Sequence, residues 1–379
     1  MKQIFHFIPI FLFAINCFSQ YATGHTTITF YDASRSRNIP VEIYYPGNIA
    51  GDDVSVAGTT EKFSYVIMSH GFTMSYSLYS NIWEALVPEG YIVVLPKTEG
   101  SLFPSHTNYA KDIAFLSTEF RKQGKLITSL FYQRIKNKCA AMGHSMGGGA
   151  TLLALQYANR INTTITFAAA ETSPSAISYC SSIVKPSLLF AGEDDCVTPF
   201  EVHQQPMYDN LASACKTLIN INGANHCQFA DYDFACSLGE LFCSTGITRE
   251  EQHDVMNTFM LPWLDYFLNG DVSALSTFNT ELTTSSAMTY SQSCSLKDAV
   301  VASEEKDLLV FPNPASNELH LISDENFTHI QVFDMQGNLI QNMQVVENRI
   351  NVSAIPAGTY LLRLSSENFT YSKVITIVN

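Results

Sequence analysis

The chain has 379 residues, of which 46% are hydrophobic and 15% charged, and its formal net charge is −14. A hydrophobic fraction of this size excludes a disordered chain, and a charged fraction below the roughly 25% of ordinary globular chains excludes a coiled coil. The excess of carboxylates argues against nucleic-acid binding, which requires a basic patch. At about 150 residues per domain, the length allows two or three domains.

The N-terminal residues 1–19 have the pattern of a secretory signal peptide. Lys2 precedes an apolar run over residues 4–18, which is shorter than the ~20 residues that span a bilayer. Cys17 and Ser19 supply the small residues of a cleavage site. A buried N-terminal helix and lipoprotein processing at Cys17 are the alternatives. No later segment reaches transmembrane length, so we expect an exported chain in an oxidising compartment.

Residues 20–295 are predicted to form one α/β domain, because short apolar runs alternate with helical patterns. Such alternation is typical of a mostly parallel, doubly wound sheet. The expected strands lie at residues 65–69, 91–95, 138–143, 163–169, 187–191 and 217–221. The expected helices lie at residues 79–89, 109–123, 146–157 and 250–268. Two antiparallel strands over residues 26–45 are expected before the first parallel strand. The Ser- and Thr-rich stretch 275–295 has no assigned helix or strand.

The composition changes after residue 295. A short charged linker is expected at residues 296–307, and residues 308–379 then alternate apolar and polar side chains between turn signals, which predicts a small all-β sandwich. The tail carries three spaced motifs, Val310-Phe-Pro-Asn-Pro-Ala-Ser, Val332-Phe-Asp-Met-Gln-Gly and Ile355-Pro-Ala-Gly-Thr-Tyr-Leu. They resemble the C-terminal sorting domain of type IX secretion substrates. The resemblance implies the type IX machinery as a partner and a secreted or cell-surface location; a carbohydrate-binding or adhesive module is the alternative.

The segment Gly143-His144-Ser145-Met146-Gly147 is a G-x-S-x-G motif between a predicted strand and a predicted helix. This context is typical of a nucleophile elbow, which lifts a serine hydroxyl out of the sheet. A serine needs a base that is oriented by an acid. In this fold the acid and then the base follow the nucleophile along the chain, and the sequence contains both in that order.

The acid is expected in the acidic loop after the strand at 187–191, where Glu193, Asp194 and Asp195 compete for the role. We favour Asp195, because the G-E-x-D-x-x-x-P pattern of hydrolases places the acid there. The base is expected to be His226, which follows the strand at 217–221 and a glycine turn. His203 and His253 lie in helical patterns and are expected to be surface or core residues.

An oxyanion hole needs two backbone N–H donors. Met146, directly after the serine, is one candidate, and Phe72 in the loop after the first predicted parallel strand is the other. We also expect the Phe72 ring to form a wall of the substrate site and His144 to line it.

Four segments resemble the dienelactone-hydrolase and cutinase-like branch of the α/β-hydrolases, which includes secreted polyester hydrolases. They are Gly143-His-Ser-Met-Gly-Gly-Gly, His70-Gly-Phe, Gly192-Glu-Asp-Asp-Cys-Val-Thr-Pro and Asn225-His-Cys. The resemblance implies an α/β-hydrolase fold and hydrolysis of small-molecule or polymeric esters through an acyl-enzyme, without a cofactor. The chain departs from this branch in two places: residues 171–177 lack the usual tryptophan, and residues 229–248 form an unfamiliar insertion in which a lid is conceivable.

Eight of the nine cysteines follow the predicted signal peptide. The sequence does not fix their connectivity. Strand ends suggest the pairs Cys196–Cys227 and Cys180–Cys215, and Cys236–Cys243 could close a short loop. The first pair also resembles an active-site disulfide of some polyester hydrolases. Cys139 is expected to be a buried free thiol, and Cys294 has no evident partner. A metal site is disfavoured, because the chain lacks a C-x-x-C pair.

These observations predict a secreted serine ester hydrolase. The same triad could instead transfer the acyl group to another alcohol or cleave a peptide bond. A non-catalytic binding protein on a hydrolase scaffold is a further alternative.

Overall fold

A computed structural model describes residues 21–294, 309–322, 327, 329–344, 349–365 and 370–378. The chain divides into two compact units, Met1–Leu296 and Lys297–Asn379. The predicted signal peptide and linker lie outside the described residues.

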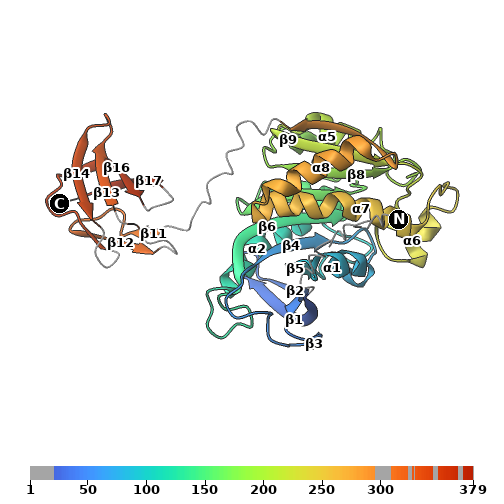
Figure 1. The fold of residues 1–379 in the computed structure, drawn as a ribbon, viewed down its shortest axis with the longest axis horizontal. Coiled ribbons are helices and arrows are strands. Elements are labelled where there is room, and N and C mark those ends of the chain that lie inside the picture. Colours follow the sequence, from blue (N-terminus) through green and yellow to red (C-terminus); the bar gives the residue numbers. More distant parts are fainter. Residues whose placement is uncertain are drawn as a thin grey trace, which may run out of the picture. The chain divides into compact units, whose positions relative to one another are not determined.

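The first unit is built on a ten-stranded sheet in the order β10-β9-β8-β7-β6-β4-β5-β2-β1-β3 (Figure 1). Its parallel centre consists of β9 (Cys215–Ile221), β8 (Ser187–Gly192), β7 (Ile161–Phe167), β6 (Ile135–His144), β4 (Phe63–Ser69) and β5 (Tyr91–Pro96). The edges are β1 (Ala22–Asp32), β2 (Arg37–Gly47), β3 (Gly51–Asp52) and the antiparallel β10 (Met288–Cys294). The predicted α/β class with a mostly parallel sheet is confirmed.

Helices cover both faces of this sheet. Along β4, Tyr65 and Ile67 join one buried cluster, while Val66 and Met68 join the other, as the two-residue period of a strand requires. The first cluster is covered by α2 (His106–Gln123), α3 (Met146–Ala154), α4 (Ala176–Cys180) and α5 (Gln204–Asn210). The second is covered by α1 (Ser80–Leu86), α7 (Arg249–Leu264) and α8 (Val272–Thr284). Burial on both faces explains why the central strands are continuous apolar runs.

The stretch 275–295 differs from its prediction, because it contains most of α8 and all of β10. In α8 only Ala274, Phe278 and Leu282 are buried, and most of the other residues of the helix are Ser or Thr. In β10 only Met288 is buried, since it is an edge strand. The apolar signal was therefore too sparse to reveal either element. The short helices α4, α5 and α6 (Phe234–Gly239) were also not predicted.

The second unit contains a three-stranded sheet, β11-β12-β15, and a four-stranded sheet, β14-β13-β16-β17. Their bounds are β11 (Leu309–Phe311), β12 (Glu318–Ile322), β13 (His329–Asp334), β14 (Leu339–Gln344), β15 (Arg349–Asn351), β16 (Gly358–Ser365) and β17 (Thr370–Ile377). Side chains from both sheets share one core, including Leu319, Val332 and Leu362. The predicted small β domain is confirmed. Across the described parts of the chain, no helix has the length and apolarity needed to cross a bilayer.

One buried carboxylate joins the lead-in strands to α2. Asp112 on α2 is fully buried and accepts hydrogen bonds from Arg37 at 3.0 and 2.8 Å, and Arg35 lies 2.7 Å from it. Removal of one partner of a buried ion pair leaves the other charges poorly solvated.

We predict that Asp112→Ala lowers the free energy of unfolding by about 2–3 kcal/mol. Glu119→Ala on the same helix breaks only an exposed pair with Lys122 and should cost at most about 0.5 kcal/mol. Urea unfolding followed by tryptophan fluorescence measures both, because Trp83 and Trp263 lie in the first unit. Equal shifts in the two variants would contradict the prediction.

Candidate functional site

Ser145 occupies a strained turn between β6 and α3, with φ 56° and ψ −122°. This is a backbone conformation that residues other than glycine rarely adopt. The turn is also crowded, because a Cβ on Gly143 would collide with the carbonyl of Gly147, and one on Gly147 would collide with the carbonyls of Ser69 and His70. The Ser145 N–H donates to the Phe167 carbonyl at 2.9 Å. The motif thus has the tight strand–turn–helix geometry that the sequence predicts.

Asp195 and His226 meet after the ends of β8 and β9. The His226 Nδ1 lies 2.8 Å from Asp195 Oδ2, and both side chains are buried. Since an ionised carboxylate only accepts hydrogen bonds, Nδ1 carries the proton and Nε2 is left as the acceptor nitrogen. The His226 ring lies 4.8 Å, between centroids, from the ring of His144, which directly precedes Ser145. The structure therefore brings the expected acid and the expected base together, next to the residue that precedes Ser145.

The Asp195 carboxylate is saturated with donors. Oδ1 accepts the N–H groups of Val197 at 2.9 Å and Thr198 at 2.7 Å, and the Thr198 hydroxyl donates to Oδ2 at 2.8 Å. Burial by itself raises the pKa of Asp195, but the hydrogen bond and charge of His226 and the Thr198 donors outweigh it and hold the pKa below its usual value. Asp195 therefore stays ionised beside the imidazole.

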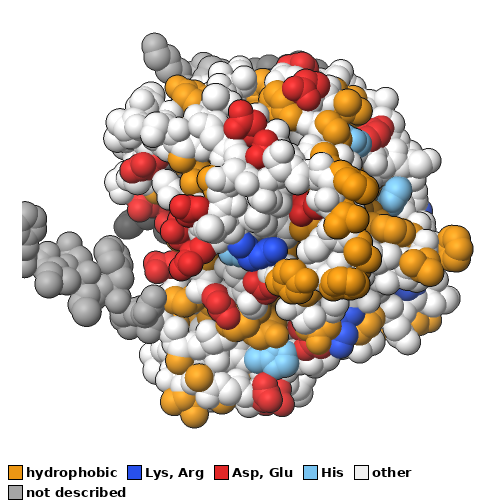
Figure 2. Space-filling model, turned by 90° about the vertical axis from the view of Figure 1, so that its right-hand side faces the viewer, with side chains coloured by type: hydrophobic (Ala, Val, Ile, Leu, Met, Phe, Trp, Pro, Cys, Tyr) orange, Lys and Arg blue, Asp and Glu red, His pale blue; other side chains and the backbone are white. Residues whose placement is uncertain are grey.

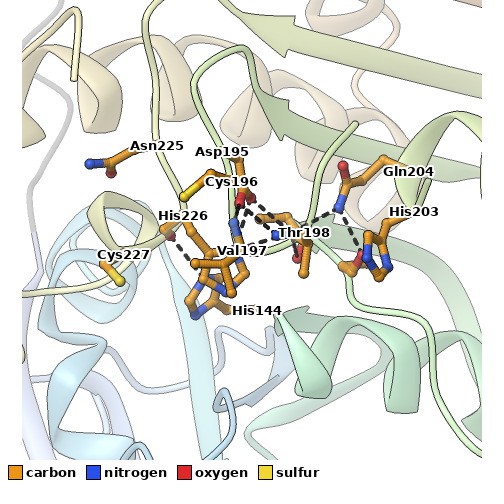
Figure 3. Close-up of polar contacts among 12 residues, drawn as sticks. His144, Asp195, Cys196, Val197, Thr198, His203, Gln204, Asn225, His226 and Cys227 are labelled. Atoms are coloured by element: carbon orange, nitrogen blue, oxygen red, sulfur yellow. Dashed lines mark hydrogen bonds and ion pairs between the residues drawn. The ribbon is translucent and has the colours of Figure 1, made fainter. Parts of the chain in front are cut away.

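Thr198 contacts both the expected acid and the expected base, and the sequence alone did not single it out. Its hydroxyl lies 3.1 Å from His226 Nδ1 and accepts a hydrogen bond from the buried Gln204 amide at 3.2 Å. Figure 3 shows Asp195, Thr198 and His226 converging, with Gln204 on the far side of Thr198 and Asn225 directed away. An aspartate side chain commonly accepts a backbone N–H two residues on, as Asp195 does from Val197, but this rule does not place the Thr198 hydroxyl beside it.

The neighbouring acids take other roles. The Glu193 carboxylate accepts the N–H of Gly223 at 2.8 Å, and the Asp194 N–H donates to the Ala224 carbonyl at 2.8 Å. His203 accepts the Glu171 N–H at 2.9 Å through Nδ1. His253 lies 3.2 Å from Asn81 Nδ2. Among the three competing acids, Asp195 is the one that contacts His226.

Phe72 and Met146 stay predictions as oxyanion donors, and the structure describes the two segments that carry them. Met146 is the first residue of α3, so its N–H belongs to the first turn, whose amides have no partner within the helix. The loop that carries Phe72 approaches Ser145 closely, because a Cβ on Gly71 would lie 3.3 Å from that of Ser145. The Phe72 side chain is 49% exposed, which suits a wall of an open site and excludes a core role.

His144 differs from its prediction, because it is fully buried and does not line a substrate surface. Its Nε2 lies 3.1 Å from the His226 carbonyl and must donate, so Nδ1 accepts from the Tyr79 hydroxyl at 2.9 Å. Tyr79 in turn accepts the Gly71 N–H at 2.8 Å. Burial first, and the neighbouring His226 second, lower the pKa of His144, which keeps it neutral. The Tyr79–His144 pair therefore links the oxyanion loop, the elbow and the base loop.

The disulfides differ from their prediction. The structure has three bonds, Cys196–Cys243, Cys215–Cys294 and Cys227–Cys236. They contradict the three predicted pairs, Cys196–Cys227, Cys180–Cys215 and Cys236–Cys243. The cysteines that follow Asp195 and His226 each bond to the insertion instead of to each other. Cys215 lies opposite Cys294 in the register of β9 and β10. The predicted burial of Cys139 as a free thiol is confirmed, and Cys180 is also free and buried.

The insertion presents an apolar surface next to these loops. Its exposed large side chains are Tyr232, Phe234, Leu238, Leu241 and Phe242. Figure 2 shows the side of the molecule on which Figure 1 shows α6. In this view hydrophobic side chains gather on the right, and many acidic side chains lie on the left. Within the described residues, no group of three or more His, Cys, Asp or Glu side chains is arranged to hold a metal.

Comparison with known proteins places this site in a family. Residues 23–295 match the model of the PET hydrolase-like family. The chain belongs to that family. The comparison agrees with the α/β-hydrolase fold and with the resemblance to cutinase-like enzymes found in the sequence.

Curated relatives are distant. Cutinase 1 of Thermobifida cellulosilytica is 25% identical over 186 residues, which are 48% of this chain and 64% of that protein. A cutinase of Thermobifida fusca is also 25% identical, over 48% of this chain and 56% of the relative. Bis(hydroxyethyl) terephthalate hydrolase of Streptomyces coelicolor is 24% identical over 48% of this chain and 54% of that protein. The chain spans less than two thirds of the length of these relatives.

The tail belongs to a second known class. Residues 309–378 match the secretion system C-terminal sorting domain. This domain indicates export by type IX secretion, as the tail motifs imply.

We predict that Cys139 and Cys180 are the two free thiols among the described residues of the native protein. Burial raises the pKa of Cys180 to about 12, and burial also raises the pKa of Cys139 above its usual range. Both should resist a thiol reagent until guanidinium unfolds the chain, and reduction should then release six more. Peptide mapping without reduction should recover the three observed pairs; a Cys180 bond would contradict them.

Proposed function

We propose that this protein is an exported carboxylic-ester hydrolase that acts through an acyl-enzyme on Ser145. The observation that carries the proposal is the buried 2.8 Å contact between Asp195 and His226 beside a serine held in an elbow turn. Membership in the PET hydrolase-like family and the names of the relatives support the same chemistry. The sorting domain supports action outside the cell.

In the proposed reaction, His226 Nε2 takes the Ser145 proton while Oγ attacks the ester carbonyl. Asp195 holds the Nδ1 proton and stabilises the imidazolium that forms. The N–H groups of Phe72 and Met146 receive the developing oxyanion, and the start of α3 adds favourable electrostatics. The imidazolium then protonates the leaving alcohol, which leaves an acyl group on Ser145. Water activated by His226 attacks this ester and regenerates the enzyme.

The surroundings of the site favour neutral, apolar esters. The chain carries a net charge of −14, so an anionic substrate would be repelled. Phe72 is 49% exposed on one side, and Val197, two residues after Asp195, is 40% exposed on the other. These side chains offer an apolar surface to an acyl or aryl group. We therefore place small apolar esters and aromatic polyesters among the substrates.

We expect the full-length protein to hydrolyse p-nitrophenyl esters, with the highest kcat/KM on short acyl chains, because the apolar side chains that border the site, Phe72 and Val197, are exposed. Ser145→Ala should lower kcat by about 10⁴-fold or more, since the nucleophile is removed. Chain lengths from acetate to palmitate give the profile. An inactive, folded and oxidised wild-type protein, or a Ser145→Ala protein of equal activity, would refute the proposal.

The acid gives a matched pair of neighbouring variants. Asp195→Asn should lower kcat by about 10³- to 10⁴-fold, because an amide does not hold the required tautomer of His226. Asp194→Asn changes the same charge one residue away and should stay within about 3-fold of wild type, which is a small effect on the barrier. Steady-state kinetics on p-nitrophenyl butyrate compares them. A larger loss in the Asp194 variant would move the acid role to that residue.

A further inference from the structure

We propose that Glu240, in the insertion, is a positioning residue for His226 in the proposed hydrolysis. The inference rests on the proposed function and adds a second carboxylate to the site. It acts on the loop that carries the base, whereas Asp195 acts on the imidazole itself.

The geometry of the base loop carries the inference. The Glu240 Oε1 accepts the backbone N–H of Cys227, directly after His226, at 2.8 Å. On the other side of the same residue, the Arg249 guanidinium donates to the Cys227 carbonyl at 2.8 Å and also to the Ala230 carbonyl. Both polar backbone groups of the residue after the base are therefore held by ionisable side chains. Such charge-assisted bonds are stronger than those between neutral groups.

Two covalent bonds fix Glu240 in place. Cys236, four residues before it, is bonded to Cys227, and Cys243, three residues after it, is bonded to Cys196. The carboxylate thus lies on a short segment anchored to the residue after the base and to the residue after the acid. A free surface glutamate would lose rotamer and backbone freedom to make the same contact, whereas here the two anchors have already restricted it.

The charged groups around the His226 imidazole determine whether the Glu240 carboxylate stabilises or destabilises a positive charge on the ring. Asp195 faces His226 Nδ1, the neutral His144 lies against the ring, and Glu240 reaches the loop from the insertion. His203 is a more distant neighbour, and Arg249 and Asp231 act on the Glu240 side. Burial raises the pKa of Glu240, while the Cys227 N–H and the charge of His226 act in the opposite direction. A carboxylate near an imidazole stabilises the positive charge that develops on the ring during the proposed reaction.

Two substitutions separate the charge from the hydrogen bond. Glu240→Gln keeps an acceptor oxygen for the Cys227 N–H but removes the charge. With less stabilisation of the imidazolium, the acid limb of the kcat/KM profile should move to lower pH by about half a unit. Glu240→Ala removes both and should lower kcat about 10-fold with KM within about 2-fold, because the base is less well oriented.

The matched control is Glu250→Gln, which removes the same charge from an exposed side chain at the start of α7. It should leave the pH profile and kcat of p-nitrophenyl butyrate hydrolysis unchanged. Tryptophan fluorescence during urea unfolding checks that each variant is folded. A merely structural role for Glu240 would change the unfolding midpoint and leave the acid limb of the Gln variant in place.

The outcomes distinguish this inference from the proposed function. A folded wild-type protein without esterase activity refutes the proposed function and with it the role of Glu240. An active wild-type protein, with Glu240→Gln and Glu240→Ala kinetics and pH profiles equal to it, overturns this inference and leaves the proposed function standing. A shift of the same size in Glu250→Gln would also overturn it, since the effect would then reflect net charge alone.

Discussion

The hydrogen bond between Asp195 and His226 is the contact around which the candidate site is organised. Its partners come from loops after two adjacent parallel strands, β8 and β9, and the contact exists only while those strands keep their register. Both groups are buried, so neither can exchange its partner for water. A buried carboxylate without donors would be costly, and the N–H groups of Val197 and Thr198 prevent that cost. The position of the acid is thus determined by backbone geometry as much as by the imidazole.

The three loops of the candidate site are not independent of one another. Tyr79 connects the N–H of Gly71 to His144, and His144 connects the elbow to the His226 carbonyl. All the hydrogen bonds in this series are buried. In a buried environment, neighbouring hydrogen bonds strengthen one another, and the loss of one partner strongly destabilises the folded state. Since a neutral His144 has one donor and one acceptor nitrogen, all the hydrogen bonds of this series donate in the same direction, from the Gly71 N–H towards the His226 carbonyl. Displacement of one loop would therefore be transmitted to the other two.

The sequence predicted those parts of the molecule that depend on local pattern. The central strands are continuous apolar runs, and the elbow is a contiguous motif, so both could be predicted from neighbouring residues. Asp195 and His226 could be proposed because each follows a strand. The contacts of Tyr79 and Glu240 could not, because they join segments far apart in the chain that no spacing rule connects. The disulfide pairs failed for the same reason. Two of them depend on how residues 229–248 fold over two loops, and the third depends on the pairing of β10 with β9.

The helix and strand at the end of the first unit show a second limit of prediction from the sequence. Ser and Thr dominate α8 and β10 because most of their surface is exposed, and sparse apolar residues give no clear period. Their identity follows only from packing, where Phe278 meets Trp263 and β10 pairs with β9. Elements at the edge of a sheet are therefore harder to predict than those at its centre.

The position of the Cys215–Cys294 bond has a mechanical consequence. Cys294 is the final residue of β10, and its disulfide partner is its register partner at the start of β9. A pulling force applied to the chain beyond Cys294 would ordinarily peel an edge strand away one hydrogen bond at a time, beginning at that end. Here the first pair to be loaded is covalent, so the tension passes directly into β9 and the strands beside it. Traction on the tail therefore loads the ten-stranded sheet through a covalent bond and does not peel β10 away from its end.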